Sequence, residues 1–204
     1  TIDRLKSKYS EKIADHEKDD FSKSLLIIGK QIKQIENLVN EFSDFARMPK
    51  PILKDNNLIS LIKDNIKLIN ELDNKIIIDF KTSKSDILLN SDSEQISRVF
   101  FNLIKNSIES IQDKKIDDVN LIGKIDISLN ENVEKINFII IDNGIGFGIF
   151  ADNIKDILNP YFTTKKKGTG LGLSIVNKII NDHNGKINFV SLDNGAKIEI
   201  MFTK

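Results

Sequence analysis

The first quarter of the chain places hydrophobic residues at helical spacing between charged and polar ones. Residues 1–16 resemble the end of an amphipathic helix, and the polar stretch 15–20 predicts a turn. From residue 21 to 46, apolar positions recur in alternating steps of four and three, which is the heptad pattern of a helix that packs against another helix. The seam consists of Phe21, Leu25, Ile28, Ile32, Ile35, Val39, Phe42 and Ala46. The pattern therefore predicts a helical hairpin over residues 1–48.

The long seam needs a partner helix, and the short first helix supplies only part of one. We expect two hairpins to associate as a homodimer with a four-helix bundle. The alternative is helical packing within one chain, without dimerisation. Pro49 and Pro51 cannot continue a helix and favour extended backbone, so we place a linker at 49–55 and a second domain at 56–204.

The second domain alternates between helical and strand periodicities. Helices are predicted near 57–72, 93–112 and 170–183, and Asp92 followed three residues later by Gln95 is a signal for the N-cap of the second of them. Strands are predicted at 76–80, 87–89, 124–130, 136–142, 186–192 and 196–202, the last two joined by a turn at Asn194–Gly195. This order predicts a two-layer α/β sandwich with a mixed sheet of about five strands and helices on one face. With the hairpin, the fold class is α+β.

Composition narrows the possible functions. The 204 residues carry 30 basic and 30 acidic side chains, and this zero net charge argues against a nucleic-acid binder. The absence of Cys excludes disulfides and thiolate metal sites. No apolar run approaches the length of a membrane span, and no signal peptide is evident. Because the chain begins at Thr1 inside a helical pattern, we interpret it as a fragment of a longer protein.

Two glycine clusters surround the most informative stretch. An apolar run at 138–141 ends in Asp142, which Gly144 and Gly146 follow, and a second cluster at 168–172 opens a helical pattern. Glycine allows close approach of backbone to a ligand, a carboxylate can accept from an adenine amino group, and a helix N-terminus favours phosphate. Taken singly, the first cluster could be a strand-ending turn and the second a flexible loop. Together they indicate a nucleotide site.

Two amides on the helix 93–112 form a third motif. Asn102 and Asn106 share a stripe with Arg98, one turn apart, and Asn is a poor helix former. An amide oxygen suits Mg²⁺, which usually binds few protein ligands together with phosphate oxygens. The alternative is that both residues are solvated surface positions in an Asn-rich chain.

Four ordered motifs resemble the N, G1, F and G2 boxes of sensor histidine kinases. They are Asn102-x-x-x-Asn106, Asp142-x-Gly144-x-Gly146, residues 160–165 (Pro-Tyr-Phe-Thr-Thr-Lys) and residues 168–173 (Gly-Thr-Gly-Leu-Gly-Leu). The helix that ends in residues 41–51 is similar to the second dimerisation helix of the nitrogen-regulation (NtrY-like) branch. The resemblance covers nearly the whole chain and implies the histidine-kinase/gyrase/Hsp ATPase type of sandwich.

The resemblance implies a role for each motif residue. Asp142 would accept from the adenine amino group, and Gly144 and Gly146 would shape the base pocket. Asn106 would ligate Mg²⁺, with Asn102 near the phosphates. Phe162 would anchor a lid, and Lys165 would reach the phosphates unless it belongs to a solvated lid face. The segment Gly168, Thr169, Gly170, Leu171 and Gly172 would bind ATP by letting the lid close and by exposing its amides to phosphate.

The chain departs from this family at the phosphoacceptor histidine. No His followed by the family's acidic, basic, Asn and Pro residues is present; His16 lies in a polar turn, and the helix dipole explains His183 at a helix C-terminus. We therefore expect no catalytic residue of this kind in the chain and no autophosphorylation by the chain alone. The resemblance implies a cytoplasmic core of an inner-membrane-anchored parent that phosphorylates its own His and passes the group to a response-regulator Asp.

Two other functions remain open from the sequence. Related ATPases of the gyrase, chaperone and mismatch-repair group activate water with a Glu one turn before the Mg²⁺-ligating Asn. Asn102 occupies that position in this chain and cannot act as a base, which disfavours hydrolysis. The second alternative is a non-catalytic dimeric module that binds ATP or scaffolds a partner.

Overall fold

The computed structural model describes residues 2–9, 13–14, 16–72, 75–147, 156–163 and 168–204. The chain divides into two compact units, Thr1–Met48 and Pro49–Lys204. Each unit is held together by its own internal contacts.

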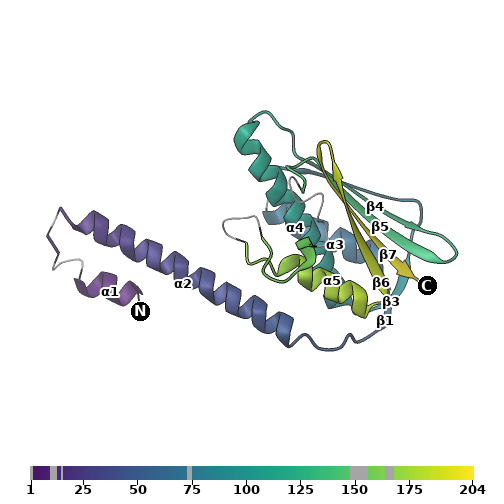
Figure 1. Ribbon diagram of the computed structural model, residues 1–204, viewed down its shortest axis with the longest axis horizontal. Helices are drawn as coiled ribbons and strands as arrows, with labels where there is room; N and C mark the ends of the chain where they lie inside the picture. The colour runs from purple at the N-terminus through teal and green to yellow at the C-terminus, as the bar shows by residue number, and fades with distance from the viewer. Residues whose placement is uncertain (1, 10–12, 15, 73–74, 148–155, 164–167) are drawn as a thin grey trace. The chain divides into compact units, whose positions relative to one another are not determined.

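The first unit contains two helices, α1 (Ile2–Tyr9) and α2 (Lys18–Ala46), both labelled in Figure 1. α2 begins three residues before the predicted start because Asp19 and Asp20 suit the positive end of the helix dipole. Along its seam Leu25 is buried, whereas the later positions are open to solvent. Ile32, Ile35 and Val39 are 54%, 62% and 55% exposed. The described residues of this unit therefore leave most of the heptad seam uncovered.

The second unit is a two-layer α/β sandwich, as predicted. Its helices α3, α4 and α5 lie on the same side of a five-stranded sheet (Figure 1). The elements are β1 (Lys54–Asn57), α3 (Leu58–Leu72), β2 (Ile77–Thr82), β3 (Leu88–Ser91), α4 (Ser93–Asp117), β4 (Lys124–Glu131), β5 (Lys135–Asp142), α5 (Gly172–Asp182), β6 (Gly185–Leu192) and β7 (Gly195–Thr203). The sheet order is β2-β4-β5-β7-β6, parallel between β2 and β4 and antiparallel elsewhere. The sheet is therefore mixed.

Two elements differ from the prediction. β1 pairs antiparallel with β3 in a separate two-stranded sheet, with Lys54 opposite Ser91 and Asn57 opposite Leu88. Its sequence, Lys-Asp-Asn-Asn, has no strand propensity, so only the pairing with β3 creates it. α4 continues to Asp117, beyond the predicted end near 112, because Lys114 and Lys115 in the last turn complement the helix dipole.

The core lies between the sheet and the helices. The apolar side chains along one face of α4 are buried, and the rings of Phe100 and Phe138 pack with centroids 4.8 Å apart. Along β5, Ile136, Phe138 and Ile140 face this core, and strand alternation gives Asp142 the same direction. The core therefore orients the candidate carboxylate toward the helical layer.

Candidate functional site

Asp142 ends β5 as a buried carboxylate that is only 5% exposed. Its Oδ1 accepts a hydrogen bond from the Gly144 amide at 2.9 Å. Burial raises the pKa of the Asp142 carboxyl, and hydrogen bonds from the Gly144 amide, the Ser107 hydroxyl and the Ala196 amide oppose that rise only partly. A carboxylate offers about four lone-pair positions, so Asp142 can also accept from a ligand amino group.

Asn143 holds the turn that follows Asp142, a role that the sequence did not indicate. Its Oδ1 accepts from the Lys124 amide at 2.8 Å, and its Nδ2 donates to the Ile122 carbonyl at 2.8 Å. The Lys114 ammonium donates to the Asn143 carbonyl at 3.0 Å. The end of β5 is thus tied to the start of β4 and to the last turn of α4.

The two glycines of the first cluster are required by close packing. A Cβ on Gly144 would lie 2.2 Å from Ser110 Oγ and 2.7 Å from the Ser110 carbonyl carbon. Gly146 has a φ of +68°, and its Cβ would lie 2.6 Å from the Gly195 carbonyl oxygen. The first cluster therefore lies directly on α4 on one side and on the β6–β7 hairpin on the other.

Gly195 is a site residue that the sequence identified only as part of a hairpin turn. Its φ is +108°, and a Cβ would lie 1.8 Å from the Asp142 carbonyl oxygen and 2.9 Å from Asn143 Cα. A contact across 53 positions of chain leaves no signal in local sequence patterns. Gly195 lets the hairpin pack against the backbone that presents the Asp142 carboxylate.

The segment 160–163 and the second glycine cluster lie side by side. The Tyr161 amide donates to the Gly170 carbonyl at 3.1 Å. Gly170 has a φ of +72°, and its Cβ would lie 2.4 Å from the Tyr161 carbonyl carbon. Phe162 is half-buried beside this contact. The structure therefore places Tyr161 and Phe162 against Gly170 of the second glycine cluster.

The second cluster leads into α5 beside Asn102. An ideal Cβ on Gly172 would lie 4.0 Å from Asn102 Oδ1. Leu171 is fully buried and occupies the N-cap position of α5, where its apolar side chain cannot cap the first turn. The first-turn amides and the positive end of the helix dipole therefore lie beside a half-buried amide oxygen of α4.

Asp142 and the two asparagines lie on the same side of the sheet. Ser107, which hydrogen-bonds Asp142, directly follows Asn106 on α4. Asn106 is half-buried one turn after Asn102. The structure thus brings together the carboxylate and the α4 amides through contacts with a single helix.

The remaining predicted residues divide into two groups. Gly168 and Thr169 precede α5, and Thr169 Oγ1 accepts from the Leu171 amide at 3.4 Å. Lys165 lies outside the described residues, as do 148–155 and the rest of 164–167.

A hollow of about 500 Å³ lies elsewhere, between α3 residues 63–71 and Ile78 and Phe80 of β2. It contains none of the motif residues, so the motif contacts define the candidate site.

The described part of the chain offers no ready-made carboxylate cage for a metal. Its residues form no cluster of three or more His, Cys, Asp or Glu side chains that could hold a metal ion. Mg²⁺ usually takes few protein ligands together with phosphate oxygens, and the amide oxygens of Asn102 and Asn106 are compatible with such a site.

Within the described residues, no helix combines the length and apolar character that crossing a membrane requires.

Comparisons with known proteins identify the family of this chain. Residues 91–204 match the family described as histidine kinase-, DNA gyrase B-, and HSP90-like ATPase. A putative sensor histidine kinase NtrY-like of Rickettsia prowazekii (strain Madrid E) is 34% identical over 201 residues, which cover 98% of this chain and 32% of that relative. The chain thus spans about a third of the length of this curated relative.

Solved structures support the same fold. The nucleotide-free catalytic domain of histidine kinase ThkA is 31% identical with a TM-score of 0.64, covering 74% of this chain and 95% of that one. Histidine kinase ThkA in complex with response regulator protein TrrA is 26% identical with a TM-score of 0.72, covering 100% of this chain and 56% of that one.

Proposed function

We propose that this chain binds Mg-ATP and presents the γ-phosphate of ATP to a histidine side chain. The chain belongs to the family of histidine kinase-, DNA gyrase B- and HSP90-like ATPases, as the catalytic core of a sensor histidine kinase. One observation carries the proposal. Ser107 of α4 hydrogen-bonds Asp142, while Asn102 of the same helix lies beside the first turn of α5. The proposed base-binding carboxylate of β5 and the proposed phosphate-binding end of α5 are thereby both held next to the same helix, α4.

Asp142 accepts the exocyclic amino group of adenine in this proposal. Gly144 and Gly146 leave room for the base, because their packing against α4 and the β6–β7 hairpin places bare backbone next to Asp142. The buried carboxylate also discriminates between purines, since a base that presents a carbonyl oxygen at that position would be repelled.

The phosphates lie between α5 and the two asparagines. The first-turn amides of α5, which no side chain caps, bind phosphate oxygens. Gly170, just before this turn, allows close packing against Tyr161 and Phe162. Asn106 would hold Mg²⁺ with Asn102 nearby, and the ion would neutralise charge on the phosphates. Phe162 anchors the lid, and Lys165 contributes a cation to the phosphates.

The Asn106→Ala variant is expected to lose the Mg²⁺-dependent part of its affinity for a non-hydrolysable ATP analogue. We expect about a tenfold loss with Mg²⁺ and less than twofold without it, because the amide oxygen serves the ion and not the base. Calorimetric titration in both conditions measures this difference. Equal losses in the two conditions would contradict the metal role, and Asn181→Ala, on exposed α5 surface, is the matched control.

The Gly172→Ala variant is expected to separate stability from binding. Among the described residues, and apart from the backbone of its own helix and chain neighbours, the added methyl group approaches only Asn102 Oδ1, at 4.0 Å. Ala favours a helix over Gly by up to about 1 kcal/mol. The urea midpoint should therefore stay constant or rise. Affinity for the ATP analogue should fall about tenfold, because the methyl group occupies the space between α5 and Asn102 that the phosphates need. Unchanged affinity would show that the phosphates lie elsewhere.

Phosphoryl transfer would go from ATP to a histidine outside this sequence and then to a response-regulator Asp. The positioning of reactants and the stabilisation of charge supply most of the rate enhancement in such reactions. The similarity to ThkA, solved in complex with response regulator TrrA, supports a response regulator as the partner. We place the core in the cytoplasm, where ATP is available, and a membrane anchor in the longer parent.

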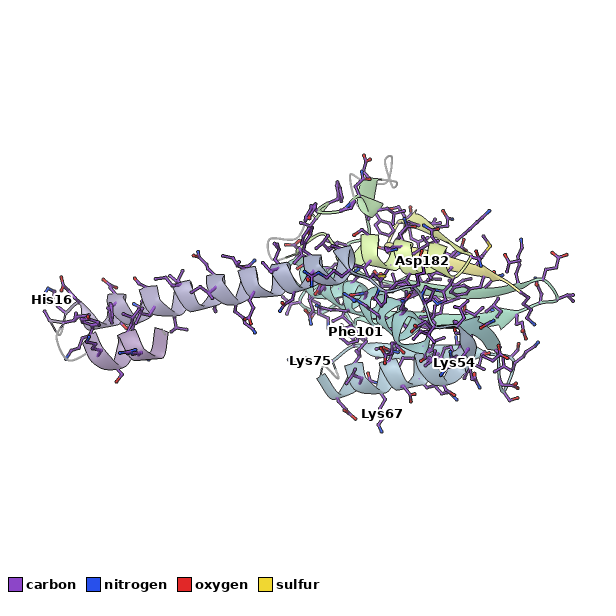
Figure 2. The ribbon with its side chains drawn as sticks, turned by 90° about the horizontal axis from the view of Figure 1, so that it is seen from below. His16, Lys54, Lys67, Lys75, Phe101 and Asp182 are labelled. Carbon is purple, nitrogen blue, oxygen red and sulfur yellow. The ribbon has the colours of Figure 1, made fainter. Side chains whose placement is uncertain are left out.

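Neither histidine of the chain suits the role of phosphoacceptor. His16 lies in the exposed turn before α2 (Figure 2). His183 is buried, and both of its ring nitrogens make hydrogen bonds with backbone groups. We therefore expect no label on this chain alone when it is incubated with γ-labelled ATP.

Label transfer tests the proposed activity. The chain, γ-labelled ATP and Mg²⁺ are mixed with a peptide that carries the family's histidine-containing first dimerisation helix. Acid-labile, base-stable label should appear on the peptide and disappear when its histidine is replaced. Binding of ATP without transfer would favour the non-catalytic module, and rapid release of inorganic phosphate would favour an ATPase, which the amide at Asn102 disfavours.

Dimerisation through α2 is part of the proposal. The exposed seam positions are spaced for helix–helix packing. The Ile35→Lys variant should shift the chain toward monomer by at least tenfold in dissociation constant, measured by sedimentation equilibrium. Gln34→Lys, one residue away and off the seam, is the matched control and should leave association unchanged. Equal association of both variants would show that the seam is not the dimer interface.

A further inference from the structure

The segment that follows the boundary between the two units is hydrogen-bonded to the N-terminal end of α4. Asp92 is the N-cap of α4, and its Oδ1 accepts from the amides of Glu94 and Gln95, each at 3.1 Å. Its Oδ2 accepts from the Ile52 amide at 2.9 Å. The Gln95 Nε2 donates to the Pro49 carbonyl at 3.1 Å. One helix end thus holds the chain at two points three residues apart.

His183 connects α5 to the same point. It is 5% exposed and directly follows the last residue of α5, Asp182, which Figure 2 labels. The Asp92 amide donates to His183 Nε2 at 3.0 Å, and His183 Nδ1 lies 2.8 Å from the Ile179 carbonyl. Because the Asp92 amide is a donor, Nε2 accepts this hydrogen bond, which leaves Nδ1 to donate to the Ile179 carbonyl. Nucleotide binding and transfer, as proposed above, make no use of this residue.

We propose that Asp92, Gln95 and His183 form a linker clamp, a set of positioning residues that fixes where the chain leaves the ATP-binding unit and thereby positions the nucleotide for transfer. The role in transfer rests on the proposed function, whereas the clamp itself rests on the hydrogen bonds alone. Because the clamp holds the chain from Pro49 onward, rotation of one unit relative to the other takes place at Arg47–Met48 and not between the two prolines.

The clamped segment is itself stiff. Pro49 and Pro51 each fix φ and bias the preceding residue toward extended backbone. Three extended residues span only about 10 Å. The hydrogen bonds at Pro49 and Ile52 therefore hold both ends of a short, stiff segment. The proline pair thus acts as a spacer between two attachment points.

The clamp lies on the same two helices as the nucleotide site. α4 begins at the clamp and carries Asn102 and Asn106 two to four turns later, while α5 runs from Gly172 to the clamp over 11 residues, about 16 Å. Although partial burial disfavours its charge, the amides of Ile52, Gln95 and Glu94 lower the pKa of Asp92. The carboxylate that holds the linker is therefore ionised at neutral pH.

Spin-label distances test the clamp in the whole chain. Because the sequence has no Cys, cysteines introduced at the exposed positions Gln34 and Asn130 give one label on α2 and one on β4. Asp92→Asn keeps an oxygen for capping α4 but places an amide donor opposite the Ile52 amide, and Gln95→Ala removes the bond to Pro49. Glu94→Gln, a charge change in the same helical turn without a linker contact, is the matched control.

The clamp predicts a label-to-label distance distribution at least 1.5-fold broader in Asp92→Asn and Gln95→Ala than in the unsubstituted chain or Glu94→Gln. Affinity for the ATP analogue should change less than twofold, and exchange of the Ile52 amide should accelerate at least tenfold in Asp92→Asn. The ¹⁵N shifts of His183 should report the Nδ1–H form. Each of these readouts differs from the effect of a general loss of stability, which would change nucleotide affinity as well.

Two results would overturn the clamp: equal distance distributions in all four proteins, or an Ile52 amide that exchanges at the same rate in Asp92→Asn as in Glu94→Gln. Failure of the proposed function looks different. In that case the unsubstituted chain does not bind the ATP analogue, while the distance and exchange measurements still decide whether the linker is held.

Discussion

The Asp142→Asn variant is expected to bind an ATP analogue roughly 30- to 140-fold more weakly, a loss of about 2–3 kcal/mol, which is typical of a hydrogen bond to a charged group. The amide of Asn directs a donor or a weaker acceptor toward the adenine amino group, whereas the carboxylate is an acceptor only. Calorimetric titration in the presence of Mg²⁺ measures this effect. A loss smaller than threefold would remove the adenine assignment.

The same variant should not lose stability at neutral pH. Burial raises the pKa of Asp142, so the ionised carboxylate costs folding free energy above its folded-state pKa, and this cost disappears below the ordinary carboxyl range. Asp142→Asn should therefore equal or exceed the unsubstituted chain in urea midpoint at pH 7, and the advantage should vanish as the pH falls below about 4. A variant that loses stability at pH 7 would show that Asp142 is primarily structural.

Asp126→Asn is the matched control for both measurements. Asp126 lies on β4 opposite Ile141, so its side chain points to the face of the sheet away from the helices. The Asp126→Asn variant removes one carboxylate from the strand next to β5, on the face of the sheet opposite Asp142. Nucleotide affinity should be unchanged in this variant, and only its surface ion pair with Lys124 is lost.

The Gly195→Ala variant is expected to be strongly destabilising for the addition of a single methyl group. The added Cβ would lie 1.8 Å from the Asp142 carbonyl oxygen, and the residue would keep a φ of +108°. Conformational strain and overpacking together predict a loss of at least about 3 kcal/mol in the free energy of unfolding. Because relief of the clash must move the Asp142 backbone, affinity for the ATP analogue should also fall at least tenfold.

Asn194→Ala separates this effect from ordinary damage to the hairpin. Asn194 precedes Gly195 in the same turn and is exposed, so its replacement should cost only a few tenths of a kcal/mol and leave affinity unchanged. Urea unfolding and calorimetry of the two variants provide the comparison. If Gly195→Ala unfolded at the same urea concentration as Asn194→Ala, the close approach of the hairpin to Asp142 would be contradicted.

Much of the fold was predictable because its determinants are local. The heptad steps of α2, the apolar face of α4, the strand alternation of β4 and β7 and the apolar run of β5 are each encoded within one element. Asp92 and Gln95 correctly marked the start of α4. The family expected from four ordered motifs is confirmed by the match over residues 91–204 together with the 34% identity to a sensor histidine kinase relative.

The unpredicted features depend on contacts between distant parts of the chain. β1 exists only through its pairing with β3, since Asn56 and Asn57 are poor strand formers. Asp92 was recognisable as a helix cap, but its bond to the Ile52 amide joins positions 40 residues apart.

His183 shows the same limit of local patterns. Its place at a helix end suggested an interaction with the helix dipole, whereas the structure shows a buried ring that joins α5 to Asp92. Gly195 is a further case, because only the folded sheet brings it to Asp142.

The central claim is that a nucleotide lies between Asp142 and the two asparagines of α4, against the first turn of α5. The most direct measurement is the ¹⁵N spectrum of the whole chain during titration with a non-hydrolysable ATP analogue, first without and then with Mg²⁺. The claim predicts that the amides of Gly144, Gly146 and Gly172 shift together, and that the Asn106 side-chain amide shifts only when Mg²⁺ is added. Shifts confined to the hollow between α3 and β2, around Ile66, Ile78 and Phe80, would contradict it.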